Sequence, residues 1–121
     1  MNTVSNRPYS RTERVADELH HILGNLFINE IFIPEAGLLT VTKVKVTQDL
    51  KLAKVYLSFL ENKITVEDLI QLIRSKHILI RHYIGMKIKL KYIPELRFYH
   101  DDTMEHAEKI DKLINKIVHD D

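Results

Sequence analysis

The 121-residue sequence contains no cysteine, and this absence removes several classes of protein at once. Disulfide-stapled folds, zinc ribbons, iron–sulfur proteins and enzymes with a cysteine nucleophile all need that side chain. Only three glycines are present, so neither a dinucleotide-binding Gly-x-Gly-x-x-Gly loop nor a phosphate-binding P-loop can be formed. The segment 1–11 is polar, and no apolar run approaches the ~20 residues that span a bilayer. We therefore expect a cytoplasmic protein with no membrane partner.

The composition of the chain is typical of a globular protein, with 45% apolar and 29% charged residues. A chain of this length buries roughly two-thirds of its unfolded surface, which is enough to fold without disulfides or metals. We expect a single domain over residues 7–121, preceded by a flexible N-terminus at residues 1–6.

The net charge of +1 conceals an uneven distribution of charge along the chain. Residues 74–99 carry seven basic groups and one acidic group, whereas residues 100–121 carry three basic and seven acidic groups. A concentrated basic block attracts polyanions, even in a protein that is nearly neutral overall. The distribution therefore favours a partner such as a nucleic acid.

The first half of the chain predicts a helix followed by a β-hairpin. Residues 8–30 carry apolar side chains at spacings of three and four, which is the pattern of one buried helix face. Residues 38–47 and 52–60 are rich in Val, Leu and Thr, and a short polar turn joins them as antiparallel strands. The alternation slips in the first strand, which predicts a β-bulge near Thr42 and Lys43.

The second half predicts two short helices, a strand and a last helix. Thr65 is placed to cap a helix whose apolar stripe breaks at the polar residues 74–77 and resumes until Gly85. From residue 86 to residue 99 apolar side chains alternate, which predicts one long strand with Pro94 at an edge or irregular position. Asp102 begins an amphipathic helix. The order of elements predicts an α+β domain with a three-stranded sheet and helices on one face.

Catalysis and metal binding have weak support in this sequence. None of the serines lies in a Gly-x-Ser-x-Gly elbow. His100, Asp101, Asp102 and His106 are metal-binding residue types, but a capped helix start with solvated carboxylates explains them better. We expect no enzyme activity, no bound metal, no cofactor and no small-molecule substrate, and we rank a metal-dependent hydrolase last among the alternatives.

The basic side chains carry the strongest functional signal. On the expected third strand, Lys87, Lys89 and Lys91 would share one face at intervals of about 6.6–6.8 Å, which is comparable to the spacing of phosphates along a nucleic acid. A second cluster stands at the junction of the two central helices, where a helix N-terminus also favours phosphate. The candidate RNA-binding residues are Arg11, Arg14, Lys43, Lys45, Arg74, Lys76, His77, Arg81, Lys87, Lys89, Lys91 and Arg97.

Two other interpretations stay open for these residues. Alternating lysines also keep a half-exposed sheet soluble, in which case the chain would be a protein-interaction or dimerisation domain without RNA binding. Tyr56, Tyr92 and Tyr99 have rings that can stack on bases, but tyrosines on small sheets more often belong to the core or its rim.

Five short motifs stand in order along nearly the whole chain. They are Arg11-x-x-Arg14-Val15, Gly37-Leu38-Leu39-Thr40-Val41-Thr42-x-Val44, Asp49-Leu50-x-x-Ala53-Lys54-Val55-Tyr56-x-Ser58-Phe59-Leu60, Arg81-x-x-x-Gly85 and Pro94-Glu95-Leu96-x-Phe98-x-x-Asp101. Together they resemble the ribosome-binding factor A family of bacteria.

The resemblance implies a type II KH-like domain and a non-catalytic, monomeric ribosome assembly factor. Such a factor binds the immature 30S small subunit and its rRNA near the decoding region, assists late maturation and rRNA processing, and supports growth in the cold. KH domains join their two central helices with Gly-x-x-Gly, and this family usually has an Ala-x-Gly kink. Residues 74–78 contain neither pattern, so the shape of the junction is open at this stage.

Overall fold

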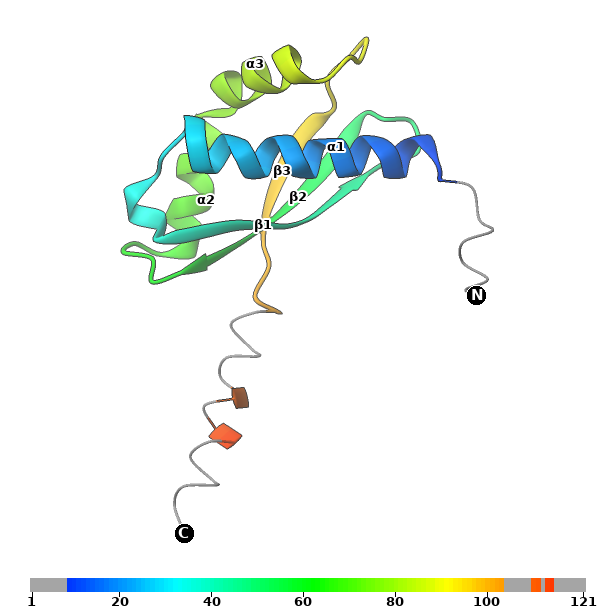
Figure 1. Ribbon diagram of the computed structural model, residues 1–121. Coiled ribbons are helices and arrows are strands. Elements are labelled where there is room, and N and C mark those ends of the chain that lie inside the picture. Colours follow the sequence, from blue (N-terminus) through cyan, green and yellow to red (C-terminus); the bar gives the residue numbers. More distant parts are fainter. Residues whose placement is uncertain (1–8, 104–109, 112, 115–121) are drawn as a thin grey trace.

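The computed structural model describes residues 9–103, 110, 111, 113 and 114. Within this part of the chain three α-helices lie on one side of a three-stranded sheet (Figure 1), so the predicted α+β fold class is confirmed. The elements are α1 (Arg11–Asn25), a π-helical turn η2 (Leu26–Glu30), a short 3-10 helix η3 (Pro34–Ala36), β1 (Leu38–Val46), β2 (Leu52–Leu60), α2 (Val66–Ser75), α3 (His77–Lys87) and β3 (Glu95–His100).

Helix α1 supplies one wall of the hydrophobic core. It begins at Ser10, whose side-chain oxygen accepts a backbone N–H of the first turn. Its apolar face is buried through Leu19 and Leu23, as the spacing of the residues predicts. The face continues beyond Asn25 through the π-helical turn, so the predicted helix over residues 8–30 is regular only as far as Asn25.

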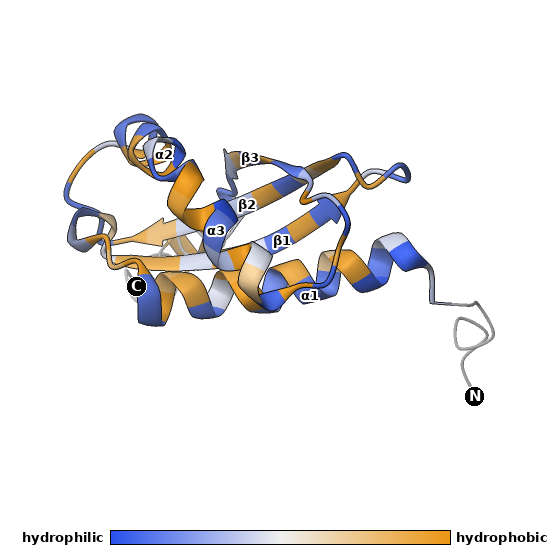
Figure 2. Cartoon of the chain, turned by 90° about the horizontal axis from the view of Figure 1, so that it is seen from above, coloured by the Kyte–Doolittle hydropathy of each residue, from blue (hydrophilic) through white to orange (hydrophobic). Residues whose placement is uncertain are grey.

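The hairpin is confirmed together with its bulge. Strands β1 and β2 pair antiparallel, and their register shifts between Val41 and Lys43. Hydrophobic and hydrophilic residues alternate along the strands (Figure 2), and the inner side chains of β2 are buried against the helices. Gly37 enters β1 with φ of 64°, and a Cβ there would lie 2.2 Å from the carbonyl oxygen of Leu60, so this close approach requires glycine.

Strand β3 lies at the edge of the sheet. The strand order is β1-β2-β3, and β3 runs parallel to β2 with Ala53 opposite Leu96 and Val55 opposite Phe98. Parallel neighbours need a crossover connection, which α2 and α3 provide. Their inner faces join those of α1 and the sheet in one hydrophobic core.

The predicted long third strand is wrong over its first half. β3 begins only at Glu95, and residues 88–94 form an irregular connection. The alternation that suggested a strand does not correspond to burial, because Met86 is 63% exposed and Tyr92 is 75% exposed. Over a short stretch, a few apolar residues at alternate positions imitate a strand pattern whether or not they share a buried face.

The predicted end of the second central helix at Gly85 is also wrong. Helix α3 continues to Lys87, because Ile84 and Ile88 lie one turn apart and both face the core, with exposures of 0% and 6%. Gly85 instead allows the connection that follows α3 to pack closely against the helix. A Cβ there would lie 3.1 Å from Cδ1 of Ile93.

The C-terminal helix falls mostly outside the described residues. Thr103 and residues 110, 111, 113 and 114 are helical. Glu105, Ala107 and Ile117, which belong to its expected cap and apolar face, lie outside that part of the chain, as do residues 1–8 at the proposed domain boundary. In the described part of the chain no helix combines the length and the hydropathy needed to cross a lipid bilayer.

Candidate nucleic-acid interface

The two central helices meet at a sharp junction. α2 ends at Ser75 and α3 begins at His77, with Lys76 between them at φ −97° and ψ 15°. The prediction of two helices at this point is confirmed, and Figure 1 shows them running in different directions. The junction bends without a small-residue motif. The ring nitrogen Nδ1 of His77 lies 3.0 Å from the carbonyl oxygen of Arg74 and closes the turn.

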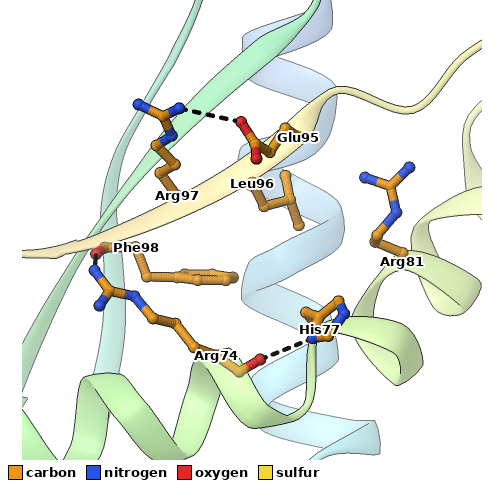
Figure 3. A pocket seen from close by; sticks show the side chains of 7 residues that line it. All are labelled: Arg74, His77, Arg81, Glu95, Leu96, Arg97 and Phe98. Carbon is orange, nitrogen blue, oxygen red and sulfur yellow. Dashed lines mark hydrogen bonds and ion pairs between the residues drawn. The ribbon is translucent and has the colours of Figure 1, made fainter.

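A hollow of about 440 Å³ lies between this junction and the edge strand β3 (Figure 3). We call it the junction groove. Three arginines and one histidine line it together with a single glutamate, so its electrostatic character is cationic. Its lining residues are Arg74, His77, Arg81, Glu95, Leu96, Arg97 and Phe98.

Two of the arginines are held in place by the free edge of the sheet. Strand β3 has no neighbouring strand on its outer side in the described part of the chain, so its outward carbonyl groups need other donors. Arg74 donates to the carbonyl oxygen of Phe98 at 3.2 Å. Arg81 donates to the carbonyl oxygens of Pro94 at 2.9 Å and Ile93 at 3.3 Å, in the connection just before β3. Because a guanidinium group has five N–H donors, both arginines keep donors and a full charge for an anion in the groove.

Arg97 joins the groove to the face of the sheet opposite to helices α1, α2 and α3. We call this the open sheet face; its cations and aromatic rings are Lys43, Lys45, Lys54, Tyr56, Arg97 and Tyr99, and the acidic Glu95 lies on the same face. Arg97 forms an exposed ion pair with Glu95 at 3.3 Å. The pairing of the strands also aligns Lys45, Lys54 and Arg97 directly across the sheet. Like charges in directly opposite positions are destabilising, so this row costs stability unless an anion covers it.

A second row on the open sheet face is aromatic. Lys43, Tyr56 and Tyr99 are aligned across the three strands in the same way. The rings of Tyr56 and Tyr99 are stacked, with centroids 5.5 Å apart and an interplanar angle of 29°. The ammonium nitrogen of Lys43 lies 5.7 Å from the centroid of the Tyr56 ring, which is a cation–π contact.

The structure does not bring the remaining predicted residues to these surfaces. The expected row of Lys87, Lys89 and Lys91 does not exist, since only Lys87 lies in a regular element and that element is a helix. Lys87 lines a hollow with Asp17 and Glu18 of α1, where carboxylates already supply negative charge.

Arg11 and Lys91 meet elsewhere, at the end of the hairpin. They line a hollow together with Lys51, which the sequence pattern did not single out. Arg14 is exposed on α1. Lys54 is the other cation that was missed. The sequence does show that Lys54 shares a face of β2 with Tyr56, because the two residues are two positions apart. Its alignment with Arg97 follows only from the parallel pairing of β2 and β3.

Asp101 has a structural role at the end of β3. Its carboxylate accepts hydrogen bonds from the Thr42 hydroxyl at 2.6 Å and from the Thr103 backbone at 3.0 Å. These bonds, with that of Thr42 first, lower the pKa of Asp101 to about 2. Among the described residues no group of three or more His, Asp or Glu side chains is placed to hold a metal ion.

The fold and the cations together define a class of protein. A sheet backed by helices on one face, with a cationic groove at the junction of its two central helices, is the arrangement of a KH-like domain. Function resides in the site rather than in the fold, and here the site is a surface of cations and rings without a catalytic constellation among the described residues.

The chain belongs to the ribosome-binding factor A family, whose sequence model matches residues 11–114. Ribosome-binding factor A of Chromohalobacter salexigens is 37% identical over 117 residues, which cover 95% of this chain and 89% of that protein. The crystal structure of ribosome-binding factor A from Thermus thermophilus matches with a TM-score of 0.65 at 18% identity, covering 75% of this chain and 97% of that one. A homology model of the Thermus thermophilus factor, fitted into a cryo-EM map of a 30S complex, matches with a TM-score of 0.56 at 17% identity, covering 78% and 96%.

Proposed function

We propose that this protein is a non-catalytic assembly factor of the small ribosomal subunit, and that it binds rRNA through the junction groove and the open sheet face. Membership of the ribosome-binding factor A family supports the partner and the absence of catalysis. A relative with the same fold is the one fitted into the map of a 30S complex. As a ribosome-binding factor the protein acts in the cytoplasm.

We choose these two surfaces because cations from separate helices and strands come together there. Arg74 and Arg81 come from two helices, and Lys45, Lys54 and Arg97 come from three strands. Arg97 belongs to both surfaces, so the groove and the open sheet face are continuous at β3. Within the described part of the chain, Arg97 is the one member of this group with an ion pair, to Glu95. Cations left without carboxylates are available to phosphate groups.

This arrangement predicts how affinity depends on salt. Each phosphate that a cation neutralises releases counterions, with a coefficient of about 0.7 for single strands and about 0.9 for duplexes. Five such contacts give a slope of log affinity against log salt near −3.5 to −4.5, as an order of magnitude. A protein–protein interaction domain without RNA binding would show no such slope with rRNA.

Two single substitutions test the surface with matched chemistry. Lys54→Gln removes one charge from the centre of the cationic row, and Lys63→Gln removes one charge from the exposed connection between β2 and α2. Binding to purified small-subunit rRNA is measured by filter retention over a salt series. We expect the slope to become shallower by about 0.7–0.9 for Lys54→Gln and to stay unchanged for Lys63→Gln. Equal slopes for the two variants would contradict the assignment of the open sheet face.

For the cations that lie outside these two surfaces, contact with RNA stays a prediction. Arg11 and Lys91 share a hollow at the end of the hairpin with Lys51 and one carboxylate, that of Asp49, so cations outnumber acidic groups there and a further phosphate contact is favoured. Lys87 is the least well placed, because Asp17 and Glu18 line the same hollow as its side chain.

A further inference from the structure

We propose that Tyr99 is a base-stacking residue, which holds an unpaired RNA base in a hollow at the outer edge of β3. The inference rests on the proposed binding of RNA. It adds that the ligand is a single-stranded segment with an accessible base, which phosphate contacts alone do not require. A surface that only attracts phosphates binds paired and unpaired RNA alike, whereas a stacking ring selects unpaired bases.

The first observation is that the aromatic row forms a stack with one free end. Tyr56 lies on the central strand, with Lys43 on one side and Tyr99 on the other. The ring of Tyr56 is therefore covered by the Lys43 ammonium group at 5.7 Å and by the stacked Tyr99 ring at 5.5 Å. Tyr99 lies on the edge strand, so no strand of the described sheet follows it. A further planar ring would extend the stack only at Tyr99.

The second observation is that Tyr99 borders a space large enough for such a ring. Tyr99 lines a hollow of about 370 Å³ between the end of β3 and α2. This volume lies in the range of small-ligand sites. On the α2 side, Glu67 and Gln71 bring polar groups that can pair with the edge of a base.

The third observation is that cations flank this hollow at distances suited to a nucleotide chain. Arg74 lines both the Tyr99 hollow and the junction groove, so the two spaces are continuous along β3. Arg97 stands two residues before Tyr99 on the same face of the strand, which is a separation of about 6.6 Å. A base on Tyr99 therefore has phosphate-binding groups on either side of its backbone.

The test compares two oligomers with the unmodified full chain and three variants. The probes are a single-stranded RNA of about twelve nucleotides and mixed sequence, and an abasic oligomer with the same number of phosphates. Tyr99→Leu removes the ring, and Tyr99→Phe keeps it. Phe32→Leu is the matched control, because it removes an aromatic ring that is 78% exposed and lies outside this hollow and both proposed RNA-binding surfaces.

The expected result is a loss that depends on bases. Stacking on one ring contributes about 5- to 150-fold in affinity, so Tyr99→Leu should weaken binding of the RNA by at least about fivefold and leave the abasic oligomer unchanged. Tyr99→Phe and Phe32→Leu should stay within about twofold of the unmodified protein. In the unmodified protein, the ring protons of Tyr99 should shift upfield in NMR spectra when the RNA is added, which keeps the test valid if Tyr99→Leu does not fold.

The outcomes separate this proposal from the function on which it rests. If the unmodified protein binds RNA and the Tyr99 ring neither shifts nor matters, the stacking role is wrong and the phosphate surface stands. An equal loss for the RNA and the abasic oligomer would also overturn stacking, since bases would then be irrelevant. If the unmodified protein binds neither oligomer nor small-subunit rRNA, both proposals fail.

Discussion

Arg81 offers the most informative single perturbation, because the structure gives it two tasks that can be separated. Its guanidinium group donates to the carbonyl oxygens of Pro94 at 2.9 Å and Ile93 at 3.3 Å, and it also lines the junction groove. Arg81→Met keeps much of the aliphatic stem and removes both hydrogen bonds. Hydrogen bonds to charged groups contribute about 1.5–3 kcal/mol each, and partial exposure with one long bond favours the lower end. We expect a total loss of about 2–3 kcal/mol in the free energy of unfolding.

The assay is equilibrium unfolding in urea, with Arg81→Lys as the conservative control. A lysine keeps the charge but cannot bridge two carbonyl groups with a planar fork. Arg81→Lys should therefore recover most of the salt slope of RNA binding but less than half of the lost stability. Amide hydrogen exchange along β3 should accelerate in both variants, because both loosen the anchor of this edge strand.

Two results would refute the reasoning about Arg81. A loss of stability below about 0.5 kcal/mol in Arg81→Met would show that the carbonyl contacts are not structural. Full recovery of stability in Arg81→Lys would show that charge alone, rather than the bidentate geometry, holds the start of β3.

Three further predictions concern the scaffold of the site. The carboxyl group of Asp101 has a pKa of about 2 in the folded protein and about 3.9 in the unfolded chain. Its contribution to stability is therefore complete above pH ~4 and is lost as the pH falls towards 2. Asp101→Asn should flatten this part of an acid-unfolding curve by less than about 1 kcal/mol, because water screens the group. Gly37→Ala should cost more than about 2 kcal/mol in thermal unfolding, since the residue has φ of 64° and its Cβ would lie 2.2 Å from the Leu60 oxygen, and an unchanged melting temperature would contradict this. Thr65→Ala removes the cap of α2, where the hydroxyl accepts the Asp68 N–H at 3.2 Å, and should cost about 1 kcal/mol by urea unfolding, with Thr65→Ser restoring it.

Local patterns in the sequence were sufficient for the hairpin and the helix junction. The slip in alternation at Thr42 and Lys43 located the bulge, and the run of polar residues from Arg74 to His77 located the break between α2 and α3. Both signals depend on neighbours within a few residues, which is the range over which side-chain periodicity reports backbone geometry.

The start of β3 could not be read in the same way. The apolar side chains of Met86 and Tyr92 continue an alternating pattern but are exposed to solvent, whereas the helix continues because Ile88 packs one turn after Ile84. Over a short stretch the apolar residues fit both a helical and a strand period. Tertiary packing decides between the two, and a single sequence does not contain that information.

In the candidate site, too, the sequence predicts what depends on neighbouring residues and does not predict what depends on strand pairing. Arg74, His77 and Arg81 were found because they are close in the sequence, and the structure places all three in one groove. The rows of the open sheet face depend on which strand lies beside which, and in what register. The parallel pairing that aligns Lys54 with Arg97 joins residues far apart in the chain, so composition and spacing could not reveal it.

The most direct test of the central claim is co-sedimentation of the protein with purified ribosomal subunits. The unmodified chain is compared with the double variant Arg74→Glu and Arg97→Glu, and with Lys63→Glu as the charge-reversal control, over a salt series. We predict salt-sensitive pelleting of the unmodified chain and of the control with small but not large subunits, and strong loss for the double variant. Pelleting of the double variant equal to that of the unmodified chain, or equal pelleting with both subunits, would contradict the account.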